Sequence, residues 1–394
     1  MRKIYIVGLA NVLLFAGCSI FERPSNAPER THRQIQKLIE KQKQAEAQQS
    51  KASNPTQVTK DSRGGKETET QPKQSLTTNV AKSRHQPNKD TIAASPSKNS
   101  ATKLEPPAAK IGNVQAGKID VLCRQLSEKL FSLSLQECLH LEFSADAISV
   151  LSRPLVHRDF IHSNTANLQR KRVLIIGGIH GDEYSSISVT FKWMRMLIKA
   201  SEHSIFDWRF LPSANPDGLL RKNPQRQNAN NVDLNRNFLT QDWYEQAISK
   251  WRSKYNSDPR RFPGDSPTSE PEVKWIVQQI ADFNPDAIIS LHAPYGRVDF
   301  DGPPKGPTKL GALTAIRLGV FPGSLGNYSG VDLKIPTVTL ELPSADKIPA
   351  KLEISSMWQD LQIWLCNHLE EQCDAAALPK GSGALGPVDV VHNR

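Results

Sequence analysis

The strongest constraint on folding is the absence of aromatic side chains from residue 22 to residue 130 of this 394-residue chain. The segment consists mainly of Gln, Lys, Ser, Asn, Thr, Pro and Ala. Such a composition cannot bury enough apolar surface to offset the chain entropy that is lost on folding. We therefore expect a disordered basic linker at 18–118, a folded domain at 119–375 and a flexible tail at 376–394.

The positive charge of the chain is concentrated in this linker. The formal net charge is +10, but residues 22–118 have 18 Lys and Arg against 9 Asp and Glu, whereas residues 119–394 have 30 against 31. A nearly neutral domain does not fit a protein that binds phosphate backbones, so we expect no nucleic-acid partner. The basic linker is either a soluble spacer or a contact with anionic polymers of the cell envelope.

The first residues are typical of an export signal. Arg2 and Lys3 precede an apolar run from Ile4 to Gly17, which is shorter than the ~20 residues that a membrane span needs. The run ends in Leu14-Phe15-Ala16-Gly17-Cys18, which resembles a bacterial lipobox with Phe15 in place of the usual leucine. This resemblance implies a lipoprotein signal peptide at 1–17, lipidation of Cys18 and a membrane anchor. The alternative is an ordinary signal peptide with a chance cysteine. Ser19, where an aspartate would retain the protein at the inner membrane, implies the outer membrane facing the periplasm.

The other four cysteines are an even number, which in an exported protein favours disulfides. Cys366 and Cys373 lie seven residues apart on a predicted helix, which places them about 10.5 Å apart along its axis. An intact helix could not bridge that gap. We therefore expect the disulfide Cys123–Cys138.

The region after residue 119 alternates between apolar strands and amphipathic helices. The expected strands are Arg172–Gly177, Trp208–Leu211, Asp286–Leu291 and Thr337–Leu342. The expected helices are Ser186–Lys199, Glu270–Phe283 and Glu353–Leu369. This alternation predicts an α/β domain with one sheet covered by helices on both faces.

The most suggestive polar motif is a His-x-x-Glu pair, His180 and Glu183, among glycines directly after the first of these strands. This spacing can place an imidazole and a carboxylate on one metal, and the carboxyl ends of strands are where open α/β sheets bind ligands. A second copy, His368 to Glu371, lies at the polar end of an apolar helix without a glycine turn. We expect that copy to be at the surface.

Four further motifs follow or interrupt the strands. Asn215-Pro216-Asp217-Gly218 alone is typical of a turn. A polar segment rich in asparagine runs from Arg226 to Phe238. His292 ends a buried strand, where a histidine is either a core residue or a ligand. Glu341 lies within an apolar strand, which is costly unless the carboxylate is paired or functional.

Taken together, the order of these motifs over residues 145–370 resembles the zinc carboxypeptidase family. The string Val-Asp-Leu-Asn-Arg-Asn-Phe at 232–238 is the most specific element. The resemblance implies a single mixed β-sheet and one zinc ion per chain. It also implies roles for eight residues: the zinc ligands His180, Glu183 and His292, the catalytic glutamate Glu341, the carbonyl-polarising Arg226, the substrate-carboxylate pair Asn235 and Arg236, and Asp233, which orients the first histidine.

Elementary chemistry requires the same groups. Three protein ligands leave one position of a zinc ion open, which is the mark of a catalytic site. A nearby carboxylate can take a proton from water, and a fixed positive charge can stabilise the oxyanion that forms. An arginine fork suits a carboxylate, and a ligating histidine needs a partner for its other nitrogen.

Within the family, the stretches 323–326 and 339–343 resemble the bacterial murein peptide amidases. Two neighbouring stretches, 292–297 and 299–303, are either a wall of the pocket or a tight loop rich in glycine and proline. Many family members also carry a tyrosine upstream of the catalytic glutamate. The corresponding stretch here, 318–326, has none, and nearby Tyr328 matches poorly, so we assign it no role.

Three functional hypotheses follow. The first is a zinc peptidase or amidase that hydrolyses peptidoglycan stem peptides or free muropeptides at the γ-D-glutamyl–diaminopimelate bond. The second is a zinc-dependent deacylase similar to the succinylglutamate desuccinylase and aspartoacylase group. The third is a lipoprotein that binds wall peptides without cleaving them. The full set of candidate ligands and base favours the first hypothesis.

Overall fold

The structure, a computed structural model, describes residues 108–161, 170–200 and 204–369, together with positions 33, 34, 37, 40 and 44. The expected signal peptide, Cys18, nearly all of the expected linker and the expected tail lie outside these residues. Among the helices that the structure describes, none combines the length and the hydrophobicity that a bilayer crossing requires.

The described chain forms one mixed nine-stranded sheet with the order β1-β2-β4-β3-β5-β9-β6-β8-β7. Its central strands β4, β3, β5 and β9 are parallel, whereas β2 and β6 pair with them in the antiparallel sense. The strands are β1 (Ser144–Ile148), β2 (Pro154–Phe160), β3 (Arg172–Gly177), β4 (Asp207–Leu211), β5 (Ala287–His292), β6 (Arg297–Asp301), β7 (Lys309–Leu310), β8 (Leu313–Ala315) and β9 (Thr337–Glu341). The four strands expected from the sequence correspond to β3, β4, β5 and β9.

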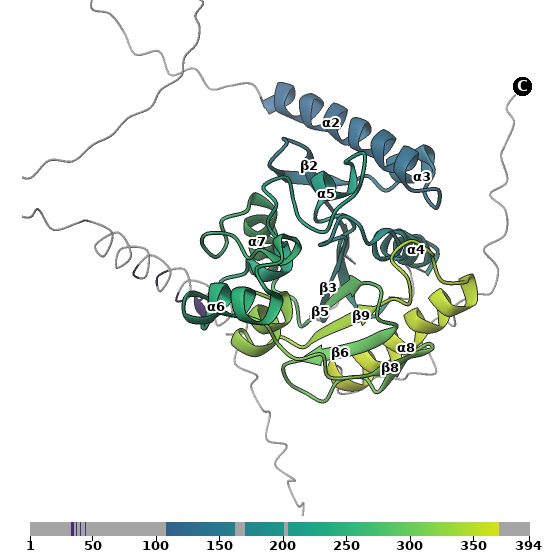
Figure 1. The fold of residues 1–394 in the computed structure, drawn as a ribbon. Helices are drawn as coiled ribbons and strands as arrows, with labels where there is room; N and C mark the ends of the chain where they lie inside the picture. Colours follow the sequence, from purple (N-terminus) through teal and green to yellow (C-terminus); the bar gives the residue numbers. More distant parts are fainter. Residues whose placement is uncertain are drawn as a thin grey trace, which may run out of the picture.

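Helices cover both faces of the sheet, as Figure 1 shows for α4 and α8 on one side and α6 and α7 on the other. The fold class expected from the sequence is therefore confirmed. The helices are α2 (Ala108–Lys129), α3 (Leu135–Leu139), α4 (Tyr184–Ala200), α5 (Pro216–Leu219), α6 (Trp243–Tyr255), α7 (Pro271–Phe283) and α8 (Lys351–Leu369), with the short turns η2 (Leu234–Arg236) and η3 (Pro259–Arg261) and the π-helix η4 (Gly326–Asp332).

Strand β3 shows how the sheet divides the core into two layers. Successive side chains of a strand point to opposite faces. Val173 and Ile175 accordingly pack with the residues of α2, α4 and α8, whereas Leu174 and Ile176 pack with those of α7 and η4. All four side chains are fully buried. The continuous apolar run therefore reflects a strand that is covered on both sides.

Helix α2 corrects the expected limits of the linker and the folded domain. It begins at Ala108, so the boundary expected at 119 falls inside a helix. Leu122, Leu126 and Leu130 recur at the spacing of one helical face and are buried against the core. This stripe holds the helix, and the preceding turns continue it outward although they contain no aromatic residue.

Two cysteines fix the end of this helix to the next one. Cys123 of α2 and Cys138 of α3, the pair expected from the sequence, form a disulfide with a Cα–Cα distance of 5.5 Å. Cys366 of α8 is also disulfide-bonded, to a partner outside the described residues.

The parallel strands bring distant sequence motifs to one edge of the sheet. β3, β5 and β9 end there side by side, and His292 at the end of β5 is the register partner of Glu341 at the end of β9. The turn after β3 carries His180 to the same edge. In open α/β sheets this carboxyl edge is where ligands bind.

Candidate metal centre and substrate cavity

The turn between β3 and α4 presents His180 and Glu183. Gly178 begins this turn with a φ of +66°, which favours glycine, and a Cβ there would collide with Ile187. The Ser186 hydroxyl donates to the Glu183 carbonyl at 2.8 Å and accepts from the Gly178 amide at 3.3 Å. The glycines around the motif therefore serve the tight turn that aims both side chains at the sheet edge.

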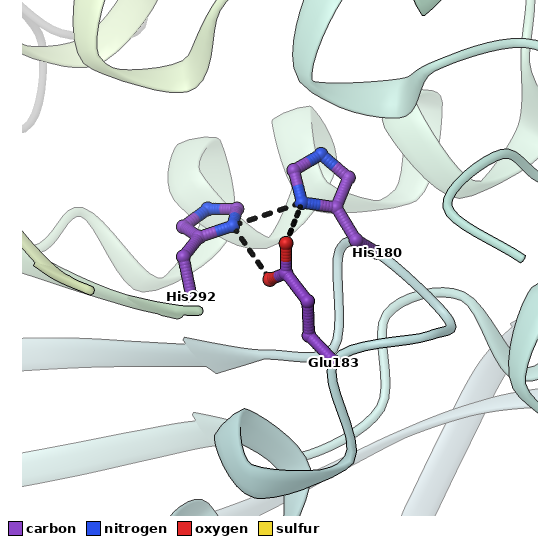
Figure 2. Close-up of side chains that lie close together, drawn as sticks. All are labelled: His180, Glu183 and His292. Carbon is purple, nitrogen blue, oxygen red and sulfur yellow. Dashed lines mark hydrogen bonds and ion pairs between the residues drawn. The ribbon is translucent and has the colours of Figure 1, made fainter. Parts of the chain in front are cut away.

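Three side chains converge on one point at this edge (Figure 2). His180 Nδ1 lies 2.8 Å from Glu183 Oε1, and His292 Nδ1 lies 3.1 Å from both His180 Nδ1 and Glu183 Oε2. Their possible ligand atoms all lie within 4.8 Å of one another. All three side chains are buried. Two imidazoles and one carboxylate are a common ligand set of catalytic zinc, so these residues fit the metal.

Asp233 joins the metal ligand His180 to two neighbouring groups. It is fully buried, and its Oδ1 lies 3.1 Å from His180 Nε2 and accepts from the Asn235 amide at 3.0 Å. Its Oδ2 accepts from Arg226 Nε at 2.8 Å. Because Nε2 of a neutral His180 donates to this carboxylate, Nδ1 keeps its lone pair for a metal. Asp233 thus lies where the sequence expects the residue that orients the first histidine.

The charged side chains around His180 and Glu183 favour the binding of a cation. Burial raises the pKa of Asp233, but Arg226 and His180 outweigh it and hold that pKa well below its usual range. Burial and Arg226 lower the pKa of His180, but Glu183 and Asp233 outweigh them and leave it raised. With neutral imidazoles, the three carboxylates of Glu183, Asp233 and Glu341 outnumber the two guanidinium groups of Arg226 and Arg236 by one charge. A cation would neutralise that excess.

Glu341 lies beside the ligands at the end of β9 and is 8% exposed. Its Oε2 is buried and has no hydrogen-bond partner within the described chain. Burial is the main cause that raises the pKa of this carboxyl, and Glu183 adds to the rise while His292 opposes it. A carboxylate without a protein partner and with a raised pKa is suited to exchange a proton with water.

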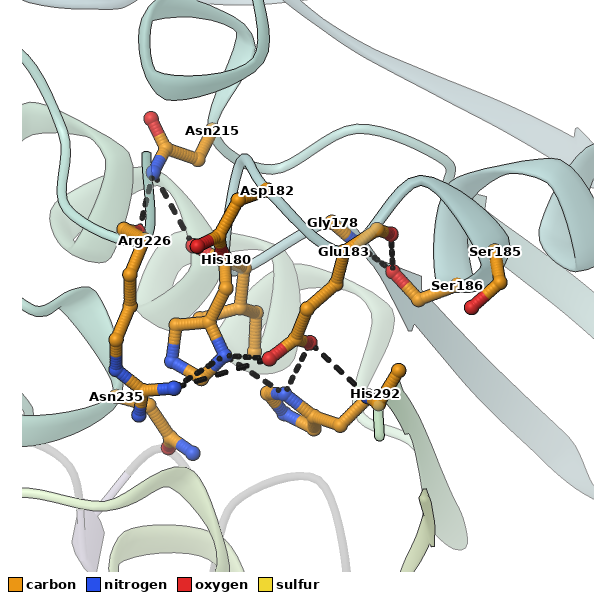
Figure 3. A network of polar contacts seen from close by, with 12 residues as sticks. Gly178, His180, Asp182, Glu183, Ser185, Ser186, Asn215, Arg226, Asn235 and His292 are labelled. Carbon is orange, nitrogen blue, oxygen red and sulfur yellow. Dashed lines mark hydrogen bonds and ion pairs between the residues drawn. The ribbon is translucent and has the colours of Figure 1, made fainter. Parts of the chain in front are cut away.

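Arg226 points at the ligands from the loop after α5 (Figure 3). Its Nη1 lies 3.2 Å from His180 Nδ1 and 3.7 Å from Glu183 Oε1. Its Nη2 makes no hydrogen bond among the residues that the structure describes. Because Asp233 fixes Nε, the guanidinium is held rigidly with one edge toward the cavity.

Asn235 and Arg236 form the next part of the wall, on the 3-10 turn η2. Asn235 Oδ1 accepts from the Leu325 amide at 2.8 Å, which leaves the two amide protons of Nδ2 to face the cavity. The guanidinium of Arg236 lies 4.7 Å from the centre of the Phe321 ring, and its Nε is buried without a hydrogen-bond partner in the described part of the chain. Both residues therefore present donors that could bind a carboxylate.

One cavity of about 500 Å³ is lined by six of these site residues: His180, Glu183, Arg226, Asn235, Arg236 and Glu341. His292 and Asp233 are not part of its lining. Its lining also contains residues to which the sequence analysis gave no role: Asp182, Tyr255, Arg260, Arg261, Ser324 and Phe321. Ala293, Pro294, Tyr295, Asp299 and Asp301 line it too, so both stretches considered for a pocket wall contribute. Tyr328 is buried in the core against Phe238 and does not belong to the lining, whereas Tyr255 and Tyr295 do.

The fold and the site define a metal-dependent hydrolase, and comparisons with known proteins identify its family. The model of the zinc carboxypeptidase family matches residues 145–298. Murein peptide amidase A of Escherichia coli (strain K12) is 32% identical over 193 residues, which are 46% of this chain and 76% of that protein. Murein peptide amidase A of Vibrio campbellii is 32% identical over 209 residues, or 50% and 79%.

Among solved structures, that of murein-tripeptide amidase MpaA from Escherichia coli O157 is 25% identical and covers 56% of this chain and 91% of that one, with a TM-score of 0.38. The protein belongs to the zinc carboxypeptidase family. It is therefore a metallopeptidase with zinc as its cofactor, in agreement with the first of the three hypotheses drawn from the sequence.

Proposed function

We propose that this protein hydrolyses peptidoglycan stem peptides or free muropeptides, at the amide bond between the γ-carbonyl of D-glutamate and diaminopimelate. The proposal rests on the similarity to murein peptide amidases over three quarters of their length, together with a cavity that carries both catalytic and carboxylate-binding groups. The scissile bond follows from chemistry. Asn235 and Arg236 need a free carboxylate next to the leaving nitrogen, and the diamino acid supplies one there.

Each residue of the cavity has a distinct task in this reaction. His180, Glu183 and His292 would hold the zinc, which as a Lewis acid would polarise a carbonyl and make water more acidic. Glu341 takes a proton from the attacking water and passes it to the leaving amine. Arg226, fixed by Asp233, stabilises the oxyanion of the tetrahedral state through its free edge.

Substrate orientation falls to Asn235 and Arg236. The amide of Asn235 and the guanidinium of Arg236 hold the α-carboxylate of the leaving residue by charge-assisted hydrogen bonds. Removing that contact should weaken transition-state binding more than it affects folding, because the protein contacts of the Arg236 guanidinium are local: a hydrogen bond to the Asn235 carbonyl and a contact with the Phe321 ring. Arg236→Ala is therefore expected to cost roughly 2–4 kcal/mol of transition-state binding on free tripeptide.

Digestion of purified tripeptide and muropeptides, followed by mass spectrometry of the products, tests the reaction. Zinc-loaded protein should release diaminopimelate, and the His180→Ala variant should lose both zinc and activity. Uncut tripeptide, together with efficient removal of an ordinary C-terminal L-residue, would instead assign a general carboxypeptidase. Full zinc occupancy of His180→Ala would show that the ligand set is wrong.

We also propose that Cys18 anchors the protein as a lipoprotein, with the catalytic domain facing the periplasm from the outer membrane. The support is the short apolar run that ends at a lipobox-like sequence. The linker would let the domain reach wall peptides from the membrane. Cys18→Ala should move the protein from the membrane pellet to the soluble fraction, and a variant that still pellets with membranes would point to another anchor.

A further inference from the structure

The strand β6 forms the wall of the cavity on the side away from β3. Its alternation sends Val298 and Phe300 into the core, where the Phe300 ring lies 5.7 Å from that of Trp364. Asp299 and Asp301 therefore point to the opposite face, which is the face of Glu341 and Thr339 on the neighbouring strand β9. Both aspartates belong to the lining of the catalytic cavity.

Arg317 is the cationic group that acts on these two carboxylates, but it forms an ion pair with neither of them. No ion pair between described residues includes Asp299 or Asp301. Asp299 is 6% exposed, its Oδ1 accepts from the amide of Phe300 at 2.9 Å, and the backbone of Leu318 is a second hydrogen-bond partner of its carboxylate. The side chain of Asp301 makes no hydrogen bond there at all. Burial and the neighbouring Asp299 raise the pKa of Asp301 to about 6, although Arg317 opposes them.

The π-helix η4 leaves space for the side chain of Asp301. A Cβ added at Gly326 would collide with the Asp301 carboxylate, and one added at Gly330 would collide with its Cβ. Two glycines of η4 therefore leave room for a charged group that contributes no hydrogen bond to the described structure. In a folded protein such a cost usually has a functional reason.

The aspartates also stand where the catalytic cavity meets a second one. A neighbouring cavity of about 550 Å³ shares Asp299, Asp301 and Gly319 with it, and its lining includes Lys305 and Arg317. Lys305 and Arg317 are exposed and form no ion pair among the described residues. A long side chain that leaves the catalytic cavity would thus pass two carboxylates and then reach two cationic groups.

Two other groups in the catalytic cavity are buried without a partner among the described residues, as is expected of groups that bind a ligand. Oε2 of Glu341 and Nε of Arg236 are buried without hydrogen-bond partners within the described chain. Glu341 is more than nine-tenths buried and lines the cavity. The acidic pair therefore belongs to a ligand-binding space.

We infer that Asp299 and Asp301 bind the distal ammonium group of the leaving residue, and that Arg317 binds the carboxylate that accompanies it. The subsite would select a diamino dicarboxylic acid as the leaving residue, a diamino monocarboxylic acid less well, and an uncharged side chain least. This inference rests on the proposed amidase function and assigns the residues that recognise its leaving group.

Three tripeptides that differ only in the leaving residue test the assignment. They are L-Ala-γ-D-Glu followed by meso-diaminopimelate, L-lysine or L-norleucine, and kcat/KM is measured for each with the zinc-loaded protein. Asp299→Asn/Asp301→Asn should lower the preference for diaminopimelate and for lysine over norleucine by about 10- to 100-fold, as for the loss of hydrogen bonds to a charged group. Arg317→Ala should lower the preference for diaminopimelate over lysine by about 3- to 10-fold.

A matched control removes one charge elsewhere. Asp282→Asn on the exposed side of α7 should leave all three ratios unchanged. Zinc content and circular dichroism verify that each variant is folded, and single Asp301→Asn serves if the double variant is not.

The outcomes separate the two proposals. Equal cleavage of all three peptides by the unaltered protein, or unchanged ratios in the folded variants, would overturn the subsite and leave the amidase function standing. Failure to cleave any of the three would overturn the amidase function itself. A loss with Arg317→Ala that is equal for lysine and diaminopimelate would overturn the role of Arg317.

Discussion

Asp233 and Asp301 are two carboxylates of one site in opposite circumstances. Asp233 is fully buried and is contacted by His180, Arg226 and the Asn235 amide, and its pKa lies well below the usual range. Asp301 makes no side-chain hydrogen bond to any described residue, and burial raises its pKa to about 6. Carboxylates of the first kind hold catalytic and metal-binding side chains in position, whereas those of the second kind have no protein partner in the described chain and are available to a ligand. Glu341, with its free Oε2, belongs to the second kind.

The largest effect should come from the free carboxylate nearest the metal ligands. Glu341→Gln keeps the size of the side chain but cannot accept the proton of water, so kcat should fall by about 10²- to 10⁴-fold. Zinc content and thermal stability should remain close to those of the unaltered protein. Near-normal turnover would show that Glu341 is a structural carboxylate, like Asp233, and not the group that takes the proton from water.

The next effect concerns the carboxylate with three protein partners. Asp233→Asn should weaken zinc binding by about 10- to 100-fold, because an amide neither orients His180 nor balances Arg226 as a carboxylate does. Competition with a fluorescent chelator measures this, and Asp301→Asn in the same assay should bind zinc normally. If both variants lost zinc to the same extent, the distinction between the two aspartates would fail.

Asp301 should also make substrate preference depend on pH. Below about pH 6 its carboxyl in the free protein is protonated, so the preference for an amine-bearing leaving residue should decline as the pH falls through that value. The charged groups around it are Asp299, Arg317 and Lys305. The measurement is the ratio of kcat/KM for lysine and norleucine peptides from pH 5 to pH 8. In Asp301→Asn this ratio should vary less, and an identical profile would contradict the assignment.

The smallest effect should be on the free energy of unfolding, which Asp301→Asn should increase, whereas most substitutions decrease it. A carboxyl whose pKa is raised by folding destabilises the folded state when it is ionised, and this penalty grows as the pH rises from the unfolded value of 3.8 through about 6. With a discount for partial exposure, Asp301→Asn should stabilise the protein by about 1 kcal/mol at pH 8, or about 2–4 °C in Tm. At pH 4 the gain should nearly vanish. A loss of stability at pH 8 would show that the carboxylate supports the fold.

The sequence predicted those parts of the fold whose pattern is locally decisive. The run Val173-Leu174-Ile175-Ile176 gave β3 with its observed bounds, because a strand covered on both faces is apolar throughout. Strand β6 was missed, since its residues were considered as a pocket wall or a loop rich in glycine and proline. Helix α2 was placed partly in the linker, because its first turns contain no aromatic residue and share the composition of the linker.

The candidate site divides in the same way. His180, Glu183, His292 and Glu341 could be found from motifs at strand ends, and the structure brings them together. Asp299 and Asp301 could not be given a role, because their significance depends on the pairing of β6 with β9. The signal that was available is the period of two in Val298-Asp299-Phe300-Asp301, in which apolar and acidic residues alternate. The cationic residues Arg260 and Arg261 reach the cavity from a separate turn, which no local pattern indicates.

The register between β5 and β9 restricts where insertions and deletions can occur in the chain. His292 and Glu341 are paired residues of adjacent strands, and side chains alternate between the two faces of a sheet. Inserting or deleting one codon within either strand would turn the histidine or the glutamate toward the opposite layer of the core and bring an apolar neighbour to the sheet edge. Insertions and deletions are therefore expected in the loops outside β5 and β9, where they do not change which face each side chain of the two strands occupies. Within the two strands, only substitutions are expected.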